Sequence, residues 1–169
     1  GSDPYILLDS SDVKKSAKTF FQTRMGNNGQ ACNSPKRMIV MDDIYDEFVT
    51  ELTALARELT PGDPADANRH EYAPLSSEAA AVGLMEQIED ARQAGATVHV
   101  GGERPDLPGY YVAPTVLTDV PNSARAYSEE LFGPVVMIYR VQTEDEAIEL
   151  ANSSSYGLGG SVFSTDQAR

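Results

Sequence analysis

Two spacings of apolar residues alternate along this chain, one typical of helices and the other of strands. Apolar residues that recur every three or four positions predict helices over residues 13–25, 42–59, 76–94 and 143–151. Short apolar or alternating runs predict strands over residues 5–8, 37–41, 97–100, 111–113, 115–117, 135–141 and 159–163. Strands that alternate with helices of about ten or more residues indicate a layered α/β fold, with a largely parallel sheet and helices on both faces.

The boundaries of the helices carry their own signals. Thr143 and Glu146 fit a capping box, in which each side chain bonds the backbone amide of the other residue. Near the end of the chain, Ser164–Gln167 is typical of the start of a further helix. Because the chain also begins with Gly1 rather than Met, we expect it to be a piece of a longer protein.

Composition and charge exclude several classes of protein. The 169 residues include 26 acidic and 13 basic side chains, which gives a net charge of −13. Such a surface repels phosphate backbones and anionic lipids, so we expect neither a nucleic-acid partner nor membrane binding. The single cysteine cannot form an internal disulfide, and no apolar run is long enough to span a bilayer. These features indicate a reduced, cytoplasmic protein of one domain's length.

Cys32 is the first candidate for chemistry. Most unpaired cysteines are buried packing residues, and that is one interpretation here. The surroundings favour another, because Gly29–Pro35 is polar, contains chain breakers and lies between a predicted helix and a predicted strand. An accessible thiol beside free backbone amides can act as a nucleophile.

A cysteine nucleophile often needs a histidine, and the chain has two. His70 lies in a polar loop and is most simply a solvated surface residue. His99 lies in an alternating strand, where we expect it to face solvent or a hydrogen-bond partner. Neither has an orienting motif. A hydrolase or acyltransferase that pairs Cys32 with His99 remains an alternative, as does a non-catalytic interaction module.

Other familiar motifs are weak or missing from the sequence. Ser11–Lys14 has the spacing of a serine–lysine nucleophile pair, but capping explains serine and aspartate at a helix start. The spacings of zinc sites, serine hydrolases and Gly-rich phosphate loops do not occur. We therefore expect no metal site, and a nucleotide would be held mostly from outside this chain.

Two adjacent glutamates open the segment Glu129–Pro134, which leads through a Gly-Pro turn into an apolar strand. The simplest interpretation is a solvated acidic turn. The functional interpretation is a carboxylate fixed at the entrance of a strand, where it accepts hydrogen bonds from ribose hydroxyls, as acidic residues do in many dinucleotide sites.

Three segments together resemble the aldehyde dehydrogenase superfamily. Phe20–Cys32 is similar to its nucleophile segment, Glu129–Pro134 to its Glu-Glu-Leu-Phe-Gly-Pro segment, and Asn152–Gly159 to the Tyr-Gly-Leu segment that follows. The segments keep the family's order, and the resemblance covers nearly the whole chain. It implies a catalytic domain of the aldehyde dehydrogenase type.

The resemblance also implies roles for particular residues. Cys32 would attack an aldehyde to form a thiohemiacetal, hydride would pass to NAD or NADP, and water would hydrolyse the resulting thioester. The backbone amide of Cys32 would donate to the oxyanion. Glu130 would bind the nicotinamide ribose, and Phe132 would pack near it.

By the same resemblance, residues 1–169 are the nucleophile-bearing part of an incomplete catalytic domain. The general-base glutamate and the cofactor-binding domain, which would hold most of the NAD or NADP, would precede Gly1. An oligomerisation segment would follow Arg169, and the parent protein would be a homo-oligomer, either a dimer or a tetramer. We expect the isolated chain to be inactive with NAD. We also expect it to self-associate, because truncation uncovers apolar surface and sheet edges.

The overall character of the chain, including Pro35–Arg37 after the cysteine, is similar to that of succinate-semialdehyde dehydrogenases and their relatives. Many of those hold the substrate carboxylate with an arginine six residues before the cysteine, where this chain has Gly26; its nearest arginine is Arg24. They often carry a second cysteine where this chain has Ser34. Succinate semialdehyde is therefore a candidate substrate whose recognition is not explained by these residues.

Overall fold

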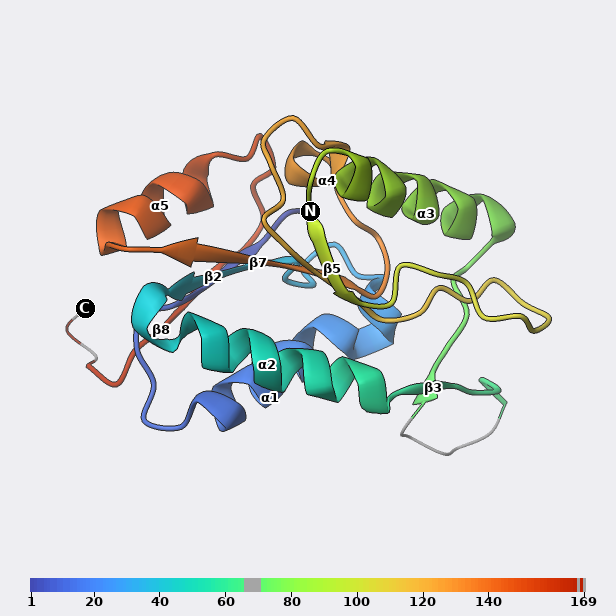
Figure 1. The fold of residues 1–169 in the computed structure, drawn as a ribbon, viewed down its shortest axis with the longest axis horizontal. Coiled ribbons are helices and arrows are strands. Elements are labelled where there is room, and N and C mark those ends of the chain that lie inside the picture. Colours follow the sequence, from blue (N-terminus) through green and yellow to red (C-terminus); the bar gives the residue numbers. More distant parts are fainter. Residues whose placement is uncertain (66–70, 167, 169) are drawn as a thin grey trace.

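A six-stranded sheet lies between two layers of helices in the computed structural model, which describes residues 1–65, 71–166 and 168 (Figure 1). The sheet contains β1 (Pro4–Leu7), β2 (Arg37–Met41), β5 (Thr97–Val100), β6 (Thr115–Thr118), β7 (Val135–Val141) and β8 (Ser161–Phe163). Across the sheet these strands follow the order β5-β6-β7-β2-β1-β8. Every neighbouring pair is parallel except β5 and β6 at one edge. The predicted layered, largely parallel α/β fold is confirmed.

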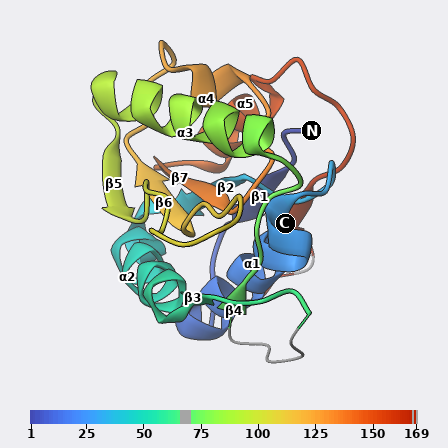
Figure 2. The same cartoon turned by 90° about the vertical axis from the view of Figure 1, so that its right-hand side faces the viewer.

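Helices cover both faces of the sheet, as the two orthogonal views show (Figures 1 and 2). One layer holds α1 (Val13–Met25) and α2 (Asp42–Glu58), and the other holds α3 (Glu78–Gln93), α4 (Arg125–Ser128) and α5 (Glu144–Asn152). A 3-10 turn, η1 (Gly26–Gly29), extends α1, and a separate two-stranded pair joins β3 (Thr60–Pro61) to β4 (Glu71–Tyr72).

Strands with both faces covered need apolar residues at nearly every position, and β7 meets this requirement. Val136 and Ile138 face the α1–α2 layer, while Val135 and Met137 face the α3 layer. All four side chains are at most 1% exposed. The alternation follows from the two-residue period of a strand.

The register of the central strands brings their amino ends to one level. Pro4 of β1 lies opposite Arg37 of β2, and Arg37 lies opposite Met137 of β7. Tyr5 of β1 lies opposite Ser161, the first residue of β8. The loops that enter β1, β2, β7 and β8 therefore emerge at the same end of the sheet.

The predicted helices are confirmed, and α2 buries one face against the core. Tyr45 and Val49 are buried beside Phe48, whereas Ile44 and Leu55 are only partly buried against the same core. At the start of α5, the Glu146 amide donates to Thr143 Oγ1 at 3.2 Å as expected. The Glu146 carboxylate, however, accepts from the amide of Gln142 at 2.7 Å instead of that of Thr143.

Two predicted elements are wrong. Residues 111–113 form no strand, because Pro114 offers no amide hydrogen and the amide of Ala113 donates to Glu103 O at 3.0 Å. Residues 164–166 are not helical, since Ser164 and Thr165 instead donate hydrogen bonds to the carboxylate of Asp9. Residue 167 lies outside the described residues.

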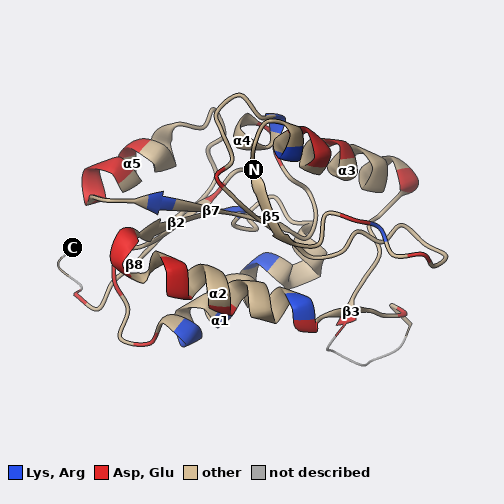
Figure 3. Ribbon diagram, viewed as in Figure 1, with Lys and Arg blue, Asp and Glu red and all other residues tan. Residues whose placement is uncertain are grey.

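Acidic residues occur along α2, α3 and α5, as the red segments of the ribbon in Figure 3 show. None of the helices in the described part of the chain is long and apolar enough to cross a membrane.

Candidate functional site

Four loops meet at the amino ends of β1, β2, β7 and β8, and we call them the amino-end loops. They comprise residues 1–3, 26–36, 129–134 and 153–160. These loops contain all or part of the three segments that resemble aldehyde dehydrogenases, including Cys32 and Glu130. The structure therefore gathers those segments, the first of which lies about 100 residues before the other two in the chain, at one end of the sheet.

Cys32 lies in a turn between η1 and β2, and its side chain is exposed. The turn is closed by a 3.0 Å hydrogen bond from the amide of Ser34 to Ala31 O. No acceptor for the Cys32 amide is found among the residues that the structure describes. The interpretation of Cys32 as a packing residue is therefore wrong. Its thiol and its backbone amide can both meet a small molecule.

The backbone before Cys32 adopts an unusual conformation. Asn27, Asn28 and Gly29 have φ angles of 50°, 56° and 72°, all in the left-handed region. Asparagine and glycine are the residues that enter this region most readily, so the local sequence suits the turn. The side chain of Asn28 donates to Ala73 O at 2.7 Å and ties the turn to the loop before α3. This loop is thus fixed by its own residue types and by a long-range contact.

Gly29 also allows a close approach between two of the amino-end loops. A Cβ at this position would overlap the carbonyl oxygen of Gly133, so only glycine fits here. Gly133 belongs to the segment that carries both glutamates. The loop that presents Cys32 and the Glu129–Pro134 turn are therefore in direct contact.

The side chain of Glu130 is 32% exposed, and Gly1 lies between it and Cys32. We call the exposed surface between Cys32 and Glu130 the opening of the site. The backbone nitrogen of Gly1 contacts Glu130 Oε1, and a Cβ on Gly1 would overlap the carbonyl oxygen of Cys32. Phe132 is 42% exposed, which is unusual for so large an apolar side chain. The structure thus brings together Cys32, Glu130 and Phe132, the three residues predicted for this site.

Glu129, the first of the two glutamates, faces away from the opening. Arg125 Nε and Gln87 Nε2 donate to its carboxylate at 3.0 and 2.8 Å. Those two hydrogen bonds, from Arg125 first, hold the pKa of Glu129 below its usual range. The two adjacent glutamates consequently differ in role: Glu129 anchors the turn on α3 and α4, while Glu130 remains at the site.

The loop before β8 forms another wall of the site. The Gly159 amide donates to the buried carboxylate of Asp3 at 3.0 Å, which explains why β8 begins two residues later than predicted. Leu158 lies beside Gly1 and is 61% exposed, and Tyr156 is 44% exposed. The walls of the site are therefore partly apolar and open to solvent.

Three buried basic side chains lie within or next to the amino-end loops, and the sequence alone did not show that they are buried there. Arg24, Lys36 and Arg37 are at most 3% exposed. Burial is the main cause that lowers the pKa of Arg24 to about 9 and that of Lys36 to about 7. The one available signal was the position of Arg24, which follows Phe20 by four residues on the apolar face of α1.

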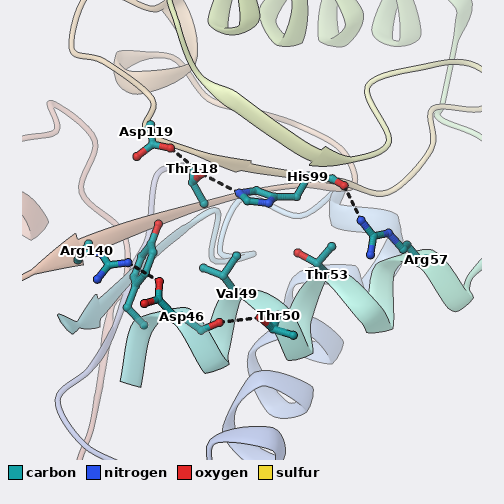
Figure 4. Close-up of a pocket in the computed structure, with 10 residues that line it drawn as sticks. Asp46, Val49, Thr50, Thr53, Arg57, His99, Thr118, Asp119 and Arg140 are labelled. Carbon is teal, nitrogen blue, oxygen red and sulfur yellow. Dashed lines mark hydrogen bonds and ion pairs between the residues drawn. The ribbon is translucent and has the colours of Figure 1, made fainter. Parts of the chain in front are cut away.

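His99 lies elsewhere, in a pocket of about 470 Å³ between α2 and the β5–β7 side of the sheet (Figure 4). Its Nε2 is 2.8 Å from Thr118 Oγ1, and its carbonyl oxygen accepts from Arg57 at 3.0 Å. No residue of the amino-end loops lines this pocket, and no hydrogen bond joins His99 to Cys32 in the described part of the chain. The Cys32–His99 pair therefore gains no support, and His70 lies outside the described residues.

An accessible cysteine beside a carboxylate, at the amino ends of parallel strands, defines an α/β domain that can present a thiol nucleophile. Comparison with known families makes this class specific. The chain belongs to the aldehyde dehydrogenase family, whose sequence profile matches residues 1–169.

Relatives and solved structures agree with this assignment. The chain is 54% identical over its whole length to a succinate-semialdehyde dehydrogenase [NADP(+)] of Deinococcus radiodurans, of which it covers 35%. The crystal structure of the succinic semialdehyde dehydrogenase from Streptococcus pyogenes with NADP+ superposes with a TM-score of 0.93 at 43% identity, over 99% of this chain and 37% of that one. Lactaldehyde dehydrogenase from Escherichia coli gives 0.92 at 35% identity, over 99% of this chain and 35% of that one.

Proposed function

We propose that residues 1–169 form the nucleophile-bearing part of the catalytic domain of an NAD(P)-dependent aldehyde dehydrogenase, which oxidises an aldehyde to a carboxylic acid. One observation carries the proposal: Cys32 is exposed, its amide has no acceptor among the described residues, and it lies in the same group of loops as Glu130. Family membership supports the same reaction class.

The chemistry at Cys32 follows from that geometry. The thiolate adds to the carbonyl carbon of the aldehyde, and the carbonyl oxygen becomes an oxyanion that the Cys32 amide can stabilise. Loss of hydride from the thiohemiacetal leaves a thioester on Cys32. Water then hydrolyses the thioester to the acid and regenerates the thiol.

The residues present suit a nicotinamide cofactor. When bound, NAD or NADP supplies the acceptor for the hydride. The Glu130 carboxylate at the opening can accept hydrogen bonds from ribose hydroxyls, and the exposed ring of Phe132 offers an apolar surface close to it. The remaining contacts to the cofactor would come from a domain outside this chain.

A larger protein is part of the proposal. The chain spans about 35% of the length of the D. radiodurans relative. The exposed Tyr156 and Leu158 at the site, and the exposed Val162 on edge strand β8, support coverage by further parts of the protein. We propose that these parts include a cofactor-binding domain and an oligomerisation segment, and that the isolated chain has no turnover.

Succinate semialdehyde is the substrate that we propose to test first, because relatives that are 54% and 41% identical to this chain are named succinate-semialdehyde dehydrogenases. The arginine nearest in sequence to Gly26 is Arg24, and it cannot bind the substrate carboxylate because it is only 1% exposed. Lys36 and Arg37 are also buried and donate to backbone carbonyls. We therefore propose that the carboxylate is recognised by a residue outside this chain.

The test is NAD(P)H formation by the full-length protein with succinate semialdehyde. We expect Cys32→Ala and Cys32→Ser to lose essentially all turnover, because the covalent step has no other nucleophile. Asn33→Ala changes the neighbouring exposed residue of the same turn and should keep near wild-type rates. Turnover that persists in Cys32→Ala would sink the proposal.

The choice of substrate is tested by comparing succinate semialdehyde with butanal, which has the same chain length but no carboxylate. A preference of about tenfold or more for succinate semialdehyde in kcat/KM is expected if the protein binds the carboxylate. Equal values for both aldehydes would leave aldehyde oxidation intact and reject the substrate.

A further inference from the structure

The guanidinium of Arg24 joins two of the amino-end loops, the one that contains Cys32 and the one that contains Glu130. Its Nη1 donates to Ser34 O at 3.0 Å and to Ser34 Oγ at 3.1 Å, two residues after Cys32. Its Nη2 donates to Leu131 O and Gly133 O, both at 2.6 Å, in the turn that carries Glu130. One side chain therefore contacts both loops.

A third contact fixes this guanidinium against the sheet. Arg24 Nε donates to Val135 O, the first residue of β7, at 2.8 Å. Ser34 Oγ donates back to Arg24 O at 2.9 Å. Every acceptor of the guanidinium among the described residues is an uncharged carbonyl or hydroxyl oxygen, and no carboxylate of those residues pairs with it.

Burial of a cation without an anionic partner is unfavourable, so the gain must come from the geometry that it imposes. A guanidinium is planar and offers five donors in a fixed arrangement, which lets one residue hold several carbonyls at once. A lysine at this position could keep the charge but not these directions.

We infer that Arg24 is a positioning residue that sets the placement of Cys32 relative to Glu130 and Phe132. The inference rests on the proposed function, because it assigns Arg24 a task in that reaction. Arg24 touches neither the opening nor a substrate there, since it is only 1% exposed. It acts through the backbone of the two loops.

Two further side chains complete the same arrangement. Lys36 Nζ donates to Glu129 O, and Gln87 Nε2 donates to Glu130 O at 3.1 Å. Together with the bonds from Arg24, these contacts hold most of the carbonyls of the Glu129–Pro134 turn. The turn is thus fixed by side chains of α1, α3 and the Cys32 loop rather than by secondary structure of its own.

The test is Arg24→Lys in the full-length protein, with KM for NADP, kcat for the aldehyde and unfolding measured together. A small shift of a reacting group is enough to lower the rate strongly, so we expect kcat to fall and the cofactor KM to rise, each by about tenfold. Leu52→Ala is the control for stability, because Leu52 is fully buried in α2 and contacts neither loop. It should lower the midpoint of unfolding while both kinetic constants stay near wild-type.

Ser34→Ala gives a milder variant in case Arg24→Lys does not fold. It removes one acceptor of the guanidinium, and we expect both constants to move in the same directions by about threefold. Folded Arg24→Lys with both constants within about twofold of wild-type would overturn the inference, as would an unchanged Ser34→Ala where Arg24→Lys cannot be purified. When Cys32→Ala is inactive in the same assays, unchanged constants in Arg24→Lys or Ser34→Ala reject only the positioning role of Arg24. When Cys32→Ala is active, the proposed function itself is rejected.

Discussion

The two ends of strand β7 are held by arginines in opposite surroundings. At the amino end, Arg24 is buried and donates only to uncharged oxygens among the described residues. At the carboxyl end, Arg140 is 40% exposed and pairs with Asp42, at 2.6 Å, and with Asp46. It also lies 4.2 Å from the centre of the Tyr45 ring. The same residue type thus serves a site at one end of the strand and a solvated surface at the other.

The difference also appears in the electrostatics. Burial lowers the pKa of Arg24 to about 9, whereas the hydrogen bond to Asp42 raises that of Arg140. Ion pairs in water are screened and contribute little to stability. A buried donor shared by several buried acceptors is costly to remove, because every one of those acceptors loses a hydrogen bond that water cannot replace. The comparison teaches that Arg24, which has no anionic partner among the described residues, contributes more to stability than the ion-paired Arg140.

The largest expected effect comes from changing both arginines to the same residue. Arg24→Met should lower the free energy of unfolding by about 3 to 5 kcal/mol, because it removes at once the hydrogen bonds that the guanidinium donates to buried oxygens of Ser34, Leu131, Gly133 and Val135. Arg140→Met should have only a small fraction of that effect. Chemical denaturation of the two variants measures both, and similar losses would contradict the comparison.

A smaller effect is expected from substituting Gly29 of η1, which contacts the Glu129–Pro134 turn. Gly29→Ala should destabilise by about 2 kcal/mol, because φ is +72° and the new Cβ would overlap Gly133 O. Gly26→Ala is the matched control, since φ is −52° and a Cβ added there would have nothing within 4 Å. Unfolding midpoints should separate the two variants. Equal values would argue against the close contact of the loops.

The smallest effect is a pH dependence carried by Lys36. Burial, with Arg24 and Arg37 nearby, lowers its pKa to about 7 against an opposing contribution from Glu129; its usual value is 10.5. Between those values the unfolded state binds more protons than the folded state, so the free energy of unfolding rises with pH. Below pH 7 both states hold the proton, and the full penalty of burial applies.

Lys36→Met removes this group and keeps a side chain of similar length. The free energy of unfolding of the wild-type protein should therefore increase relative to that of Lys36→Met between about pH 7 and pH 9.5. Tyrosines and other groups titrate in both proteins and cancel. A constant difference across that range would show that Lys36 is not buried as a low-pKa amine.

The layered fold could be predicted from the sequence because its helices and strands show clear apolar periodicity. The shared site of Cys32 and Glu130 could be predicted because both residues lie in segments that resemble those of one family. Sequence reasoning missed α4 and the β3–β4 pair, which are too short to show a period. It also missed Arg24 and Lys36, because charged residues are ordinarily assigned to the surface and their acceptors are backbone atoms without a sequence signature. Only the structure shows that the carbonyls of Leu131 and Gly133 accept hydrogen bonds from Arg24.

The central claim is that Cys32 is the accessible nucleophile beside Glu130. It is tested most directly by acid-quenching the full-length protein during turnover of succinate semialdehyde and mapping covalent adducts by mass spectrometry. The account predicts a hydroxylamine-sensitive acyl group on the peptide that contains Cys32, and none in Cys32→Ala. Steady turnover with an unmodified Cys32 peptide, undiminished in Cys32→Ala, would contradict it.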